Sequence, residues 1–215
     1  MPDRKDEKRP IIEIIKNGPI KISHLKNFYR ANGEKIPPKD VVYLCRCGAS
    51  ENKPYCDGKH VESGFTGDKE DDRSADKWKV YTGDKINVRD NRGICSHSGE
   101  CTRGLPSVFN VDNRPWINPA GAEAQEIMDI IKKCPSGALQ YEYRNRLAKD
   151  FTYETAVHIC KNGALNITGD VELIDPEGNR PPAESHFALC RCGASKNKPF
   201  CDGSHGKIDF RDDKN

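Results

Sequence analysis

The sequence predicts an α+β protein in which two small β-rich modules flank a third unit of mixed strands and helix. A shift of 145 residues aligns the two ends of the 215-residue chain without a gap, so that the segment from Lys16 corresponds to the segment from Lys161. Short apolar runs around Asn-Gly pairs indicate strands in both copies. The stretch between the copies differs from both and contains a helix-period run of isoleucines.

The domain boundaries follow from this repeat. We expect a first module over residues 1–66, a charged linker over 67–77, a mixed unit over 78–148 and a second module over 149–215. Only 35% of the residues are hydrophobic and the mean hydropathy is −0.82, which is little material for a large core. Units of about 70 residues with so little apolar content usually depend on a metal or another cross-link.

Each module is expected to begin with a β-hairpin. Apolar residues precede the Asn-Gly pairs at Asn17 and Asn162, and alternating residues follow them. A further strand is predicted over 41–44 in the first module and over 186–189 in the second. Both strands lead directly into a group of cysteines.

A sixteen-residue string with three cysteines and one histidine occurs in both modules, with the spacing C-x-C-x8-C-x3-H. The two sets are Cys45, Cys47, Cys56 and His60, and Cys190, Cys192, Cys201 and His205. Three thiolates and an imidazole form a complete ligand set for a metal. Asp57 and Asp202 stand where an N-cap would open a short helix that carries the histidine in its first turn.

The spacing of the ligands bears on the choice of metal. Structural zinc sites usually present C-x2–4-C pairs, and the single residue between the first two cysteines is tight for two ligands of one zinc. An iron–sulfur cluster spreads its ligands over two irons. The first two cysteines could then bind one iron, and the third cysteine and the histidine the other. Zinc remains the alternative.

The string resembles the CDGSH, or mitoNEET-like, iron–sulfur signature C-x-C-x2-S/T-x3-P-x-C-D-G-S/A/T-H. The second copy matches at every position, and the first has Lys59 where a small residue is usual. The resemblance implies one [2Fe-2S] cluster in each module. It also implies that the two modules pair through swapped strands, as the family's two-fold dimers do. We therefore expect a monomer with an internal pseudo-two-fold axis, with a homodimer as the alternative.

The middle unit carries a different cysteine pattern. Cys95 and Cys101 lie in one loop, and Cys134 lies far downstream before a proline. Cubane ferredoxins draw their ligands from a C-x2-C-x2-C loop and a remote Cys-Pro, and here Ser98 replaces the second cysteine. The segment from about 78 to 143 resembles a divergent single-cluster ferredoxin domain.

The missing thiolate leaves the nuclearity of this cluster open. A [3Fe-4S] cluster lacks the iron that the second cysteine would bind. A [4Fe-4S] cluster would need an extra ligand, for which His97 and Ser98 are the nearest candidates.

The rest of the middle unit fits a small α+β fold. Asn118 and Pro119 are expected to open a helix, and its isoleucines at 127, 130 and 131 share one face that presents Cys134 inward at the helix end. Strands are predicted over 78–81, 86–88 and 139–143.

Three further residues need an interpretation: one cysteine outside the ligand sets and two arginines within the repeated strings. Cys160 aligns with the apolar Ile15 and is predicted to be a buried, inert thiol, with a ligand or resolving thiol as the alternative. Arg46 and Arg191 lie between paired cysteines and would favour a reduced, more negative cluster, unless they are simply solvated.

The ligand sets point to electron transfer. We expect single electrons to pass between redox partner proteins through two [2Fe-2S] clusters and one [3Fe-4S] or [4Fe-4S] cluster. A neutral imidazole in place of a thiolate should raise the potential above that of all-cysteine clusters. The alternative is cluster storage, transfer to apo-acceptor proteins, or redox or iron sensing, because a histidine ligand can be protonated.

Other function classes find no support in the sequence. No nucleophile and base, nucleotide loop or flavin motif is recognisable, so we expect no enzymatic activity. The net charge of +2 gives no basis for a nucleic-acid partner. No apolar run is long enough for a membrane span, and the charged N-terminus has no signal-like apolar region. A reducing cytoplasm is expected, because nine of the ten cysteines fall into ligand sets.

Overall fold

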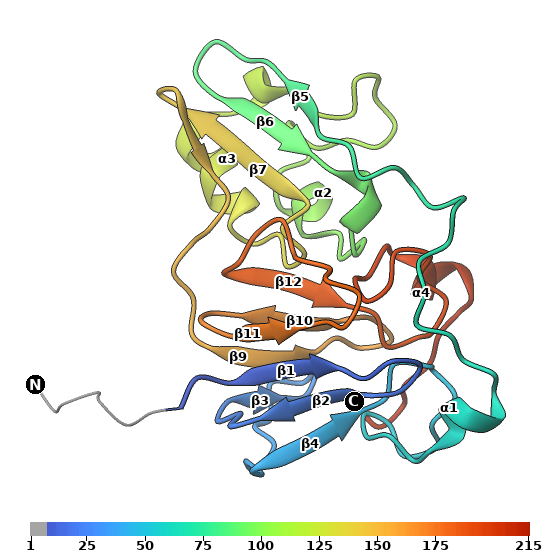
Figure 1. The fold of residues 1–215 in the computed structure, drawn as a ribbon. Helices are drawn as coiled ribbons and strands as arrows, with labels where there is room; N and C mark the ends of the chain where they lie inside the picture. The colour runs from blue at the N-terminus through green and yellow to red at the C-terminus, as the bar shows by residue number, and fades with distance from the viewer. Residues whose placement is uncertain (1–7) are drawn as a thin grey trace, which may run out of the picture.

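The computed structural model describes residues 8–215 as three four-stranded sheets joined by loops and short helices (Figure 1). One sheet belongs to the middle domain, and the other two are built by the repeated modules. Figure 1 shows the sheet of the second module between the middle domain and the strands of the first module. The predicted α+β class, with a mixed domain inserted between two β-rich modules, is confirmed.

The first sheet has the order β11-β1-β2-β4. Its strands are β1 (Ile11–Ile14), β2 (Ile20–Ser23), β4 (Val41–Leu44) and β11 (Glu172–Ile174). Asn17 takes a φ of 49° in the turn between β1 and β2, a conformation that asparagine tolerates better than most residues. The predicted hairpin is therefore confirmed. The first strand of this hairpin, β1, pairs in parallel with the edge strand β11, which comes from the second module.

The second sheet has the order β12-β10-β9-β3 and mirrors the first. Its strands are β3 (Phe28–Tyr29), β9 (Ala156–Ile159), β10 (Leu165–Thr168) and β12 (His186–Leu189). Here the first hairpin strand, β9, pairs in parallel with the edge strand β3, which comes from the first module. Each module thus lends a strand to the other. The pairing through swapped strands that the resemblance implied occurs inside one chain.

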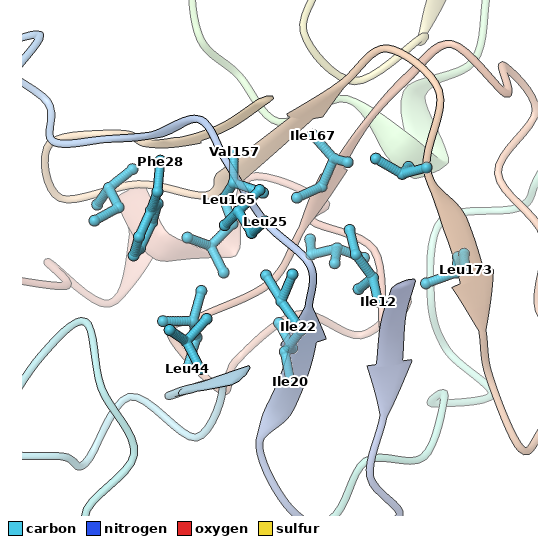
Figure 2. Close-up of a cluster of buried hydrophobic side chains, with 14 of the residues drawn as sticks. Ile12, Ile20, Ile22, Leu25, Phe28, Leu44, Val157, Leu165, Ile167 and Leu173 are labelled. Carbon is cyan, nitrogen blue, oxygen red and sulfur yellow. The ribbon is translucent and has the colours of Figure 1, made fainter. Parts of the chain in front are cut away.

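One hydrophobic core lies between the two sheets (Figure 2). Ile12 and Ile22 of the first module are fully buried together with Val157 and Leu165 of the second. Burial of each such side chain contributes about 1.5–3 kcal/mol. Since neither module has these contacts alone, the two modules stabilise each other and hold their cysteine loops in a constant relation.

The middle domain contains an antiparallel sheet with a helix packed on it. The strands are β5 (Lys79–Tyr81), β6 (Asn87–Asp90), β7 (Leu139–Tyr143) and β8 (Arg146–Ala148). Helix α3 (Ala124–Ile131) buries Ile127, Ile130 and Ile131 in the core of this domain. The shorter elements are η1 (Arg92–Ile94), α2 (Glu100–Gly104) and η2 (Pro119–Gly121).

The helix start predicted at Asn118 is wrong. Asn118 caps only the 3-10 turn η2, and the chain becomes extended again at Ala122, with a φ of −159°. Helix α3 has its own capping box, formed by Glu123 and Glu126, and ends at Ile131. Cys134 therefore lies in a turn after the helix, where its N–H donates to the carbonyl of Ile131 at 2.9 Å.

The charged segment 67–77 has no regular structure, but it is hydrogen-bonded to both the second module and the middle domain. The N–H of Glu70 donates to the carbonyl of Lys196 at 2.9 Å, and Lys196 forms an ion pair with Asp72. Asn91 of the middle domain donates to Asp76 at 2.8 Å. The segment thus helps to join the middle domain to the second module. Over residues 8–215, the helices are too short or too polar to span a bilayer.

Candidate metal centres

The repeated strings fold back along the strands that precede them. In the first string (residues 45–60), Cys45 follows β4 directly, and its N–H donates to the carbonyl of Pro54 at 2.8 Å. The N–H of Cys56 donates to the carbonyl of Tyr43 at 2.9 Å. A short helix, α1 (Lys59–Glu62), then carries His60. The second string (residues 190–205) repeats these bonds and ends in α4 (Ser204–Lys207) with His205.

The potential ligands of each string lie in two pairs. In the first string the Sγ atoms of Cys45 and Cys47 are 3.6 Å apart, and Sγ of Cys56 is 3.4 Å from Nδ1 of His60. The second string repeats both pairs at 3.7 and 3.4 Å. Among residues 8–215, no three or more such side chains converge on one metal position. Two separate pairs fit the two irons of a binuclear cluster better than a four-coordinate zinc.

The aspartates before the histidines are not helix caps, which corrects the expectation for Asp57 and Asp202. The N-caps are Gly58 and Gly203, each with a left-handed φ, at 91° and 83°. The Asp57 carboxylate accepts the N–H groups of Glu51 and Lys59 at 2.8 and 3.2 Å. The second string repeats this arrangement. These aspartates close the loop that holds the ligands.

The two thiols of each cysteine pair lie within hydrogen-bond distance of each other. A hydrogen bond from Cys47 lowers the pKa of Cys45 to about 6, and the same bond raises the pKa of Cys47. Cys190 and Cys192 behave alike, and the pKa of Cys190 is lowered to about 6. One thiolate of each pair is therefore available near neutral pH. A metal that binds both sulfurs must displace only the remaining proton.

Arg46 and Arg191 are buried, so the alternative that they are simply solvated is wrong. Arg46 donates from Nε to the carbonyl of Gly18 at 2.8 Å and from Nη2 to that of Ile15 at 2.9 Å. Arg191 makes the equivalent bonds to Gly163 and Cys160. Each arginine fixes the hairpin turn of its module beside the cysteines and places a positive charge there.

The three cysteines of the middle domain line one cavity of about 210 Å³. Cys95 follows η1, Cys101 lies on α2, and Cys134 follows α3. Burial raises the pKa of Cys95 to about 11 and also raises that of Cys101. These thiols are therefore protonated near neutral pH until a metal replaces their protons.

His97 and Ser98 also border this cavity. Both residues are exposed, and His97 has a left-handed φ of 53°. Nε2 of His97 is 3.3 Å from a guanidinium nitrogen of Arg92. Ser98 accepts a bond from Arg103 only through its carbonyl, at 2.8 Å.

Three buried polar residues at this cavity, Asp90, Ser96 and Ser136, were not singled out from the sequence. Asp90 accepts a bond from Nε1 of Trp116 at 3.2 Å, and burial raises the pKa of its carboxyl group. The hydroxyl of Ser136 is 3.8 Å from Sγ of Cys134. Asp90 lies two residues after the predicted strand of residues 86–88, but only the tertiary structure shows that its side chain is buried beside the cysteine cavity.

Cys160 belongs to none of the three groups. Its thiol is half-buried, and burial raises its pKa. Its carbonyl accepts a bond from Arg191 at 2.6 Å.

Comparison with known proteins agrees with this division of the chain. The family model described as iron-binding zinc finger, CDGSH type, matches residues 17–61 and 162–206. The model described as divergent 4Fe-4S mono-cluster matches residues 81–144.

Relatives among curated proteins cover only part of the chain. The uncharacterized protein YjdI of Escherichia coli K12 is 43% identical over 67 residues, which are 31% of this chain and 88% of that protein. YjdI of Escherichia coli O157:H7 matches to the same extent. No solved structure matches the chain significantly. The chain is thus an iron–sulfur protein, and it belongs to the CDGSH family, with two CDGSH modules flanking a divergent 4Fe-4S mono-cluster domain.

Proposed function

We propose that this protein transfers single electrons between redox proteins and is not itself an enzyme. Its cofactors would be two [2Fe-2S] clusters and one [3Fe-4S] or [4Fe-4S] cluster, which supply one-electron redox chemistry. Their ligands would be Cys45, Cys47, Cys56 and His60; Cys190, Cys192, Cys201 and His205; and Cys95, Cys101 and Cys134. We refer to these sets as the first CDGSH site, the second CDGSH site and the middle site.

The observation that carries this proposal is the direct contact between the three ligand-bearing loops. Cys47 and Cys192 form an antiparallel bridge, so the backbones of the two CDGSH sites touch. His97, from the cysteine loop of the middle domain, lies against Gly203 in the second string. A protein that stored unrelated clusters would have no need for such contacts, whereas an electron pathway depends on them.

The protein groups would hold the clusters and adjust their charge. In each CDGSH site three thiolates and one neutral imidazole leave a less negative ligand set than four thiolates would, which makes reduction easier. Arg46 and Arg191 add positive charge beside the paired cysteines.

One feature favours a second function, the donation of a cluster to an acceptor protein. Cys47, Cys56 and His60 of the first site are only half-buried, so this site is accessible from outside. A histidine ligand exposed in this way can be protonated and released.

Reversible redox cycling separates the two functions. The anaerobically purified chain would be reduced with dithionite and reoxidised over several cycles, with iron, sulfide and visible absorbance measured after each one. An electron carrier keeps its clusters throughout, and does so when apo-ferredoxin is present. Transfer of iron and sulfide to apo-ferredoxin, at a rate that matches their loss from this chain, would favour cluster donation instead.

A further inference from the structure

The middle domain covers the second string and leaves the equivalent part of the first string open. Asn197 is 1% exposed and donates from Nδ2 to the carbonyl of Gly93 at 2.9 Å. Its counterpart Asn52 is exposed. In Figure 1 the orange and red strands of the second module separate the green middle domain from the blue strands of the first. Two sites with the same ligands therefore lie in different surroundings.

His97 makes a second contact between the middle domain and the second string. A Cβ atom built on Gly203 would be 2.7 Å from Cγ of His97, so the ring can lie against this turn only because the residue is glycine. Gly203 is the N-cap of the helix that carries His205. A Cβ on the equivalent Gly58 meets nothing within 4 Å. The contact is therefore a property of the second site alone.

The thiols of the second site are also better shielded from water. Cys192 and Cys201 are 7% and 2% exposed, whereas their counterparts Cys47 and Cys56 are half-buried. A site that already carries negative charge accepts a further electron less readily when water cannot solvate it. Burial therefore lowers the potential of the second site relative to the first.

A buried carboxylate acts in the same direction. Arg191 and Asp212 form an ion pair whose side chains are 2% and 1% exposed. The aligned position in the first module is Gly67, and both residues donate their N–H to the asparagine of the hairpin turn, at 2.8 and 2.9 Å. Among residues 8–215 no carboxylate forms an ion pair with Arg46. Asp68 and Asp175 act on Arg46 only at longer range. Asp212 therefore neutralises the arginine of the second site more completely than the arginine of the first site is neutralised.

The second site nevertheless touches the first. A Cβ atom on Gly48 would collide with the carbonyl of Cys192, and one on Gly193 with the carbonyl of Cys47. The loops meet in this way at the Cys47–Cys192 bridge. The second site therefore has the middle site on one side and the first site on the other.

We propose that the second CDGSH site is an internal relay of lower potential, and that the first CDGSH site is where electrons leave the protein. This proposal rests on the electron-transfer function proposed above. A reduced one-electron carrier protein supplies the electron to the middle site, which passes it to the second site and then to the first. An oxidised one-electron carrier protein removes it there. Each step moves one electron, and no bond or proton changes place at the ligands.

Redox titration of the full-length holoprotein, followed by EPR, tests the difference in potential. His60→Cys and His205→Cys would identify the two CDGSH signals, because each should displace one of them. We expect the lower potential to belong to the site with His205. Equal potentials, or the lower potential at the site with His60, would overturn the proposal. Failure of the proposed function looks different, because the protein would then lack iron and sulfide or would not cycle.

Substitution of Asp212, which pairs with Arg191, and of Gly67, the aligned residue in the first module, gives a matched pair of variants. Asp212→Asn should raise the potential of the second site alone, and Gly67→Asp should lower that of the first site alone. Gly67→Asp keeps the test decisive if Asp212→Asn does not fold. An unchanged first potential in folded Gly67→Asp protein would contradict the role given to Asp212.

The order of the sites is tested through magnetic relaxation and kinetics. With the middle site paramagnetic, the signal of the second site should relax faster than that of the first. His97→Ala should slow electron equilibration between the middle and second sites in rapid-freeze EPR and leave both potentials unchanged. His24→Asn replaces a histidine of the first module, with a left-handed φ of 60°, and serves as the control. Faster relaxation at the first site, an unchanged rate in His97→Ala, or loss of one iron from its middle cluster would each overturn the proposal.

Discussion

Among single residues, the histidine at the end of each string should have the clearest effect, because it is the one neutral, protonatable ligand proposed for its site. His60→Cys and His205→Cys should each lower the potential of one [2Fe-2S] centre, since a thiolate adds negative charge. Each should also slow the loss of that cluster in acid, because a thiolate replaces an imidazole that competes for protons. Redox titration and absorbance at falling pH measure both effects. If neither variant changes either quantity, these histidines are not ligands.

We expect the nuclearity of the middle cluster to depend on Ser98. The loop offers a hydroxyl where a cubane ferredoxin has its second cysteine, so we expect the oxidised protein to show a [3Fe-4S] EPR signal or to lose one iron readily. Ser98→Cys should convert this centre into a stable [4Fe-4S] cluster, which EPR and iron analysis would detect. A four-iron cluster that is stable before the substitution, and becomes labile only in His97→Ala, would instead make His97 the fourth ligand.

His186 should make the stability of the fold depend on pH. It is 1% exposed, and burial lowers its pKa to about 4. In the unfolded chain this histidine binds a proton near pH 6.5, so burial of the neutral ring costs no proton above that pH. As the pH falls from about 6.5 towards the folded pKa, the free energy of unfolding decreases, by about 3 kcal/mol in all.

The variant His186→Phe tests this dependence. It should keep the ring contacts with Phe151 and Tyr153 and reduce the loss of stability between about pH 7 and about pH 5. Urea unfolding followed by circular dichroism measures the change, with His24→Asn as control. Equal pH dependence in His186→Phe and the unaltered protein would contradict the role of His186.

Among the elements, the swapped strand β11 tests whether the two modules fold as one unit. Leu173 belongs to the second module by sequence, but its strand pairs with β1 and its side chain is buried in the shared core. Leu173→Ala should cost about 2–5 kcal/mol and destabilise the first cluster along with the second. Its neighbour Ile174 is 44% exposed, and Ile174→Ala should change the stability by less than about 0.5 kcal/mol. Urea unfolding, followed by the visible absorbance of the clusters, would show whether both clusters are lost in one transition. Loss of the second cluster alone would show that the modules are independent.

The elements also show how far the sequence could predict the structure. The hairpins and the strands before the cysteines follow local patterns, and both were found where they were predicted. The start of α3 was misplaced because Asn118 and Pro119 are good capping residues that serve a separate 3-10 turn.

Long-range contacts were beyond the reach of local patterns. The burial of Arg46 and Arg191 depends on carbonyls about 28 residues earlier in the chain. The contact of His97 with Gly203 joins two domains, and no local pattern in the sequence indicates it. Alignment of the two modules shows that Gly67 in the first corresponds to Asp212 in the second. Only the structure shows that Asp212 forms a buried ion pair with Arg191.

At the scale of the whole molecule, internal duplication and one inserted domain place three ligand groups in contact. The shared core holds the two CDGSH sites together at the Cys47–Cys192 bridge. The middle domain then breaks the symmetry, because it contacts one of the two strings. The two CDGSH sites therefore differ in their surroundings: the middle domain covers part of the second string, and the equivalent part of the first string is open.

The cofactor content of the full-length chain tests the central claim most directly. Protein purified anaerobically would be analysed for iron, acid-labile sulfide and zinc, with Mössbauer and EPR spectra to identify the clusters. We expect two [2Fe-2S] clusters and one cubane-type cluster per chain, because the ligands of each string form two pairs and the three middle cysteines share one cavity. Stoichiometric zinc in place of iron and sulfide would contradict the account.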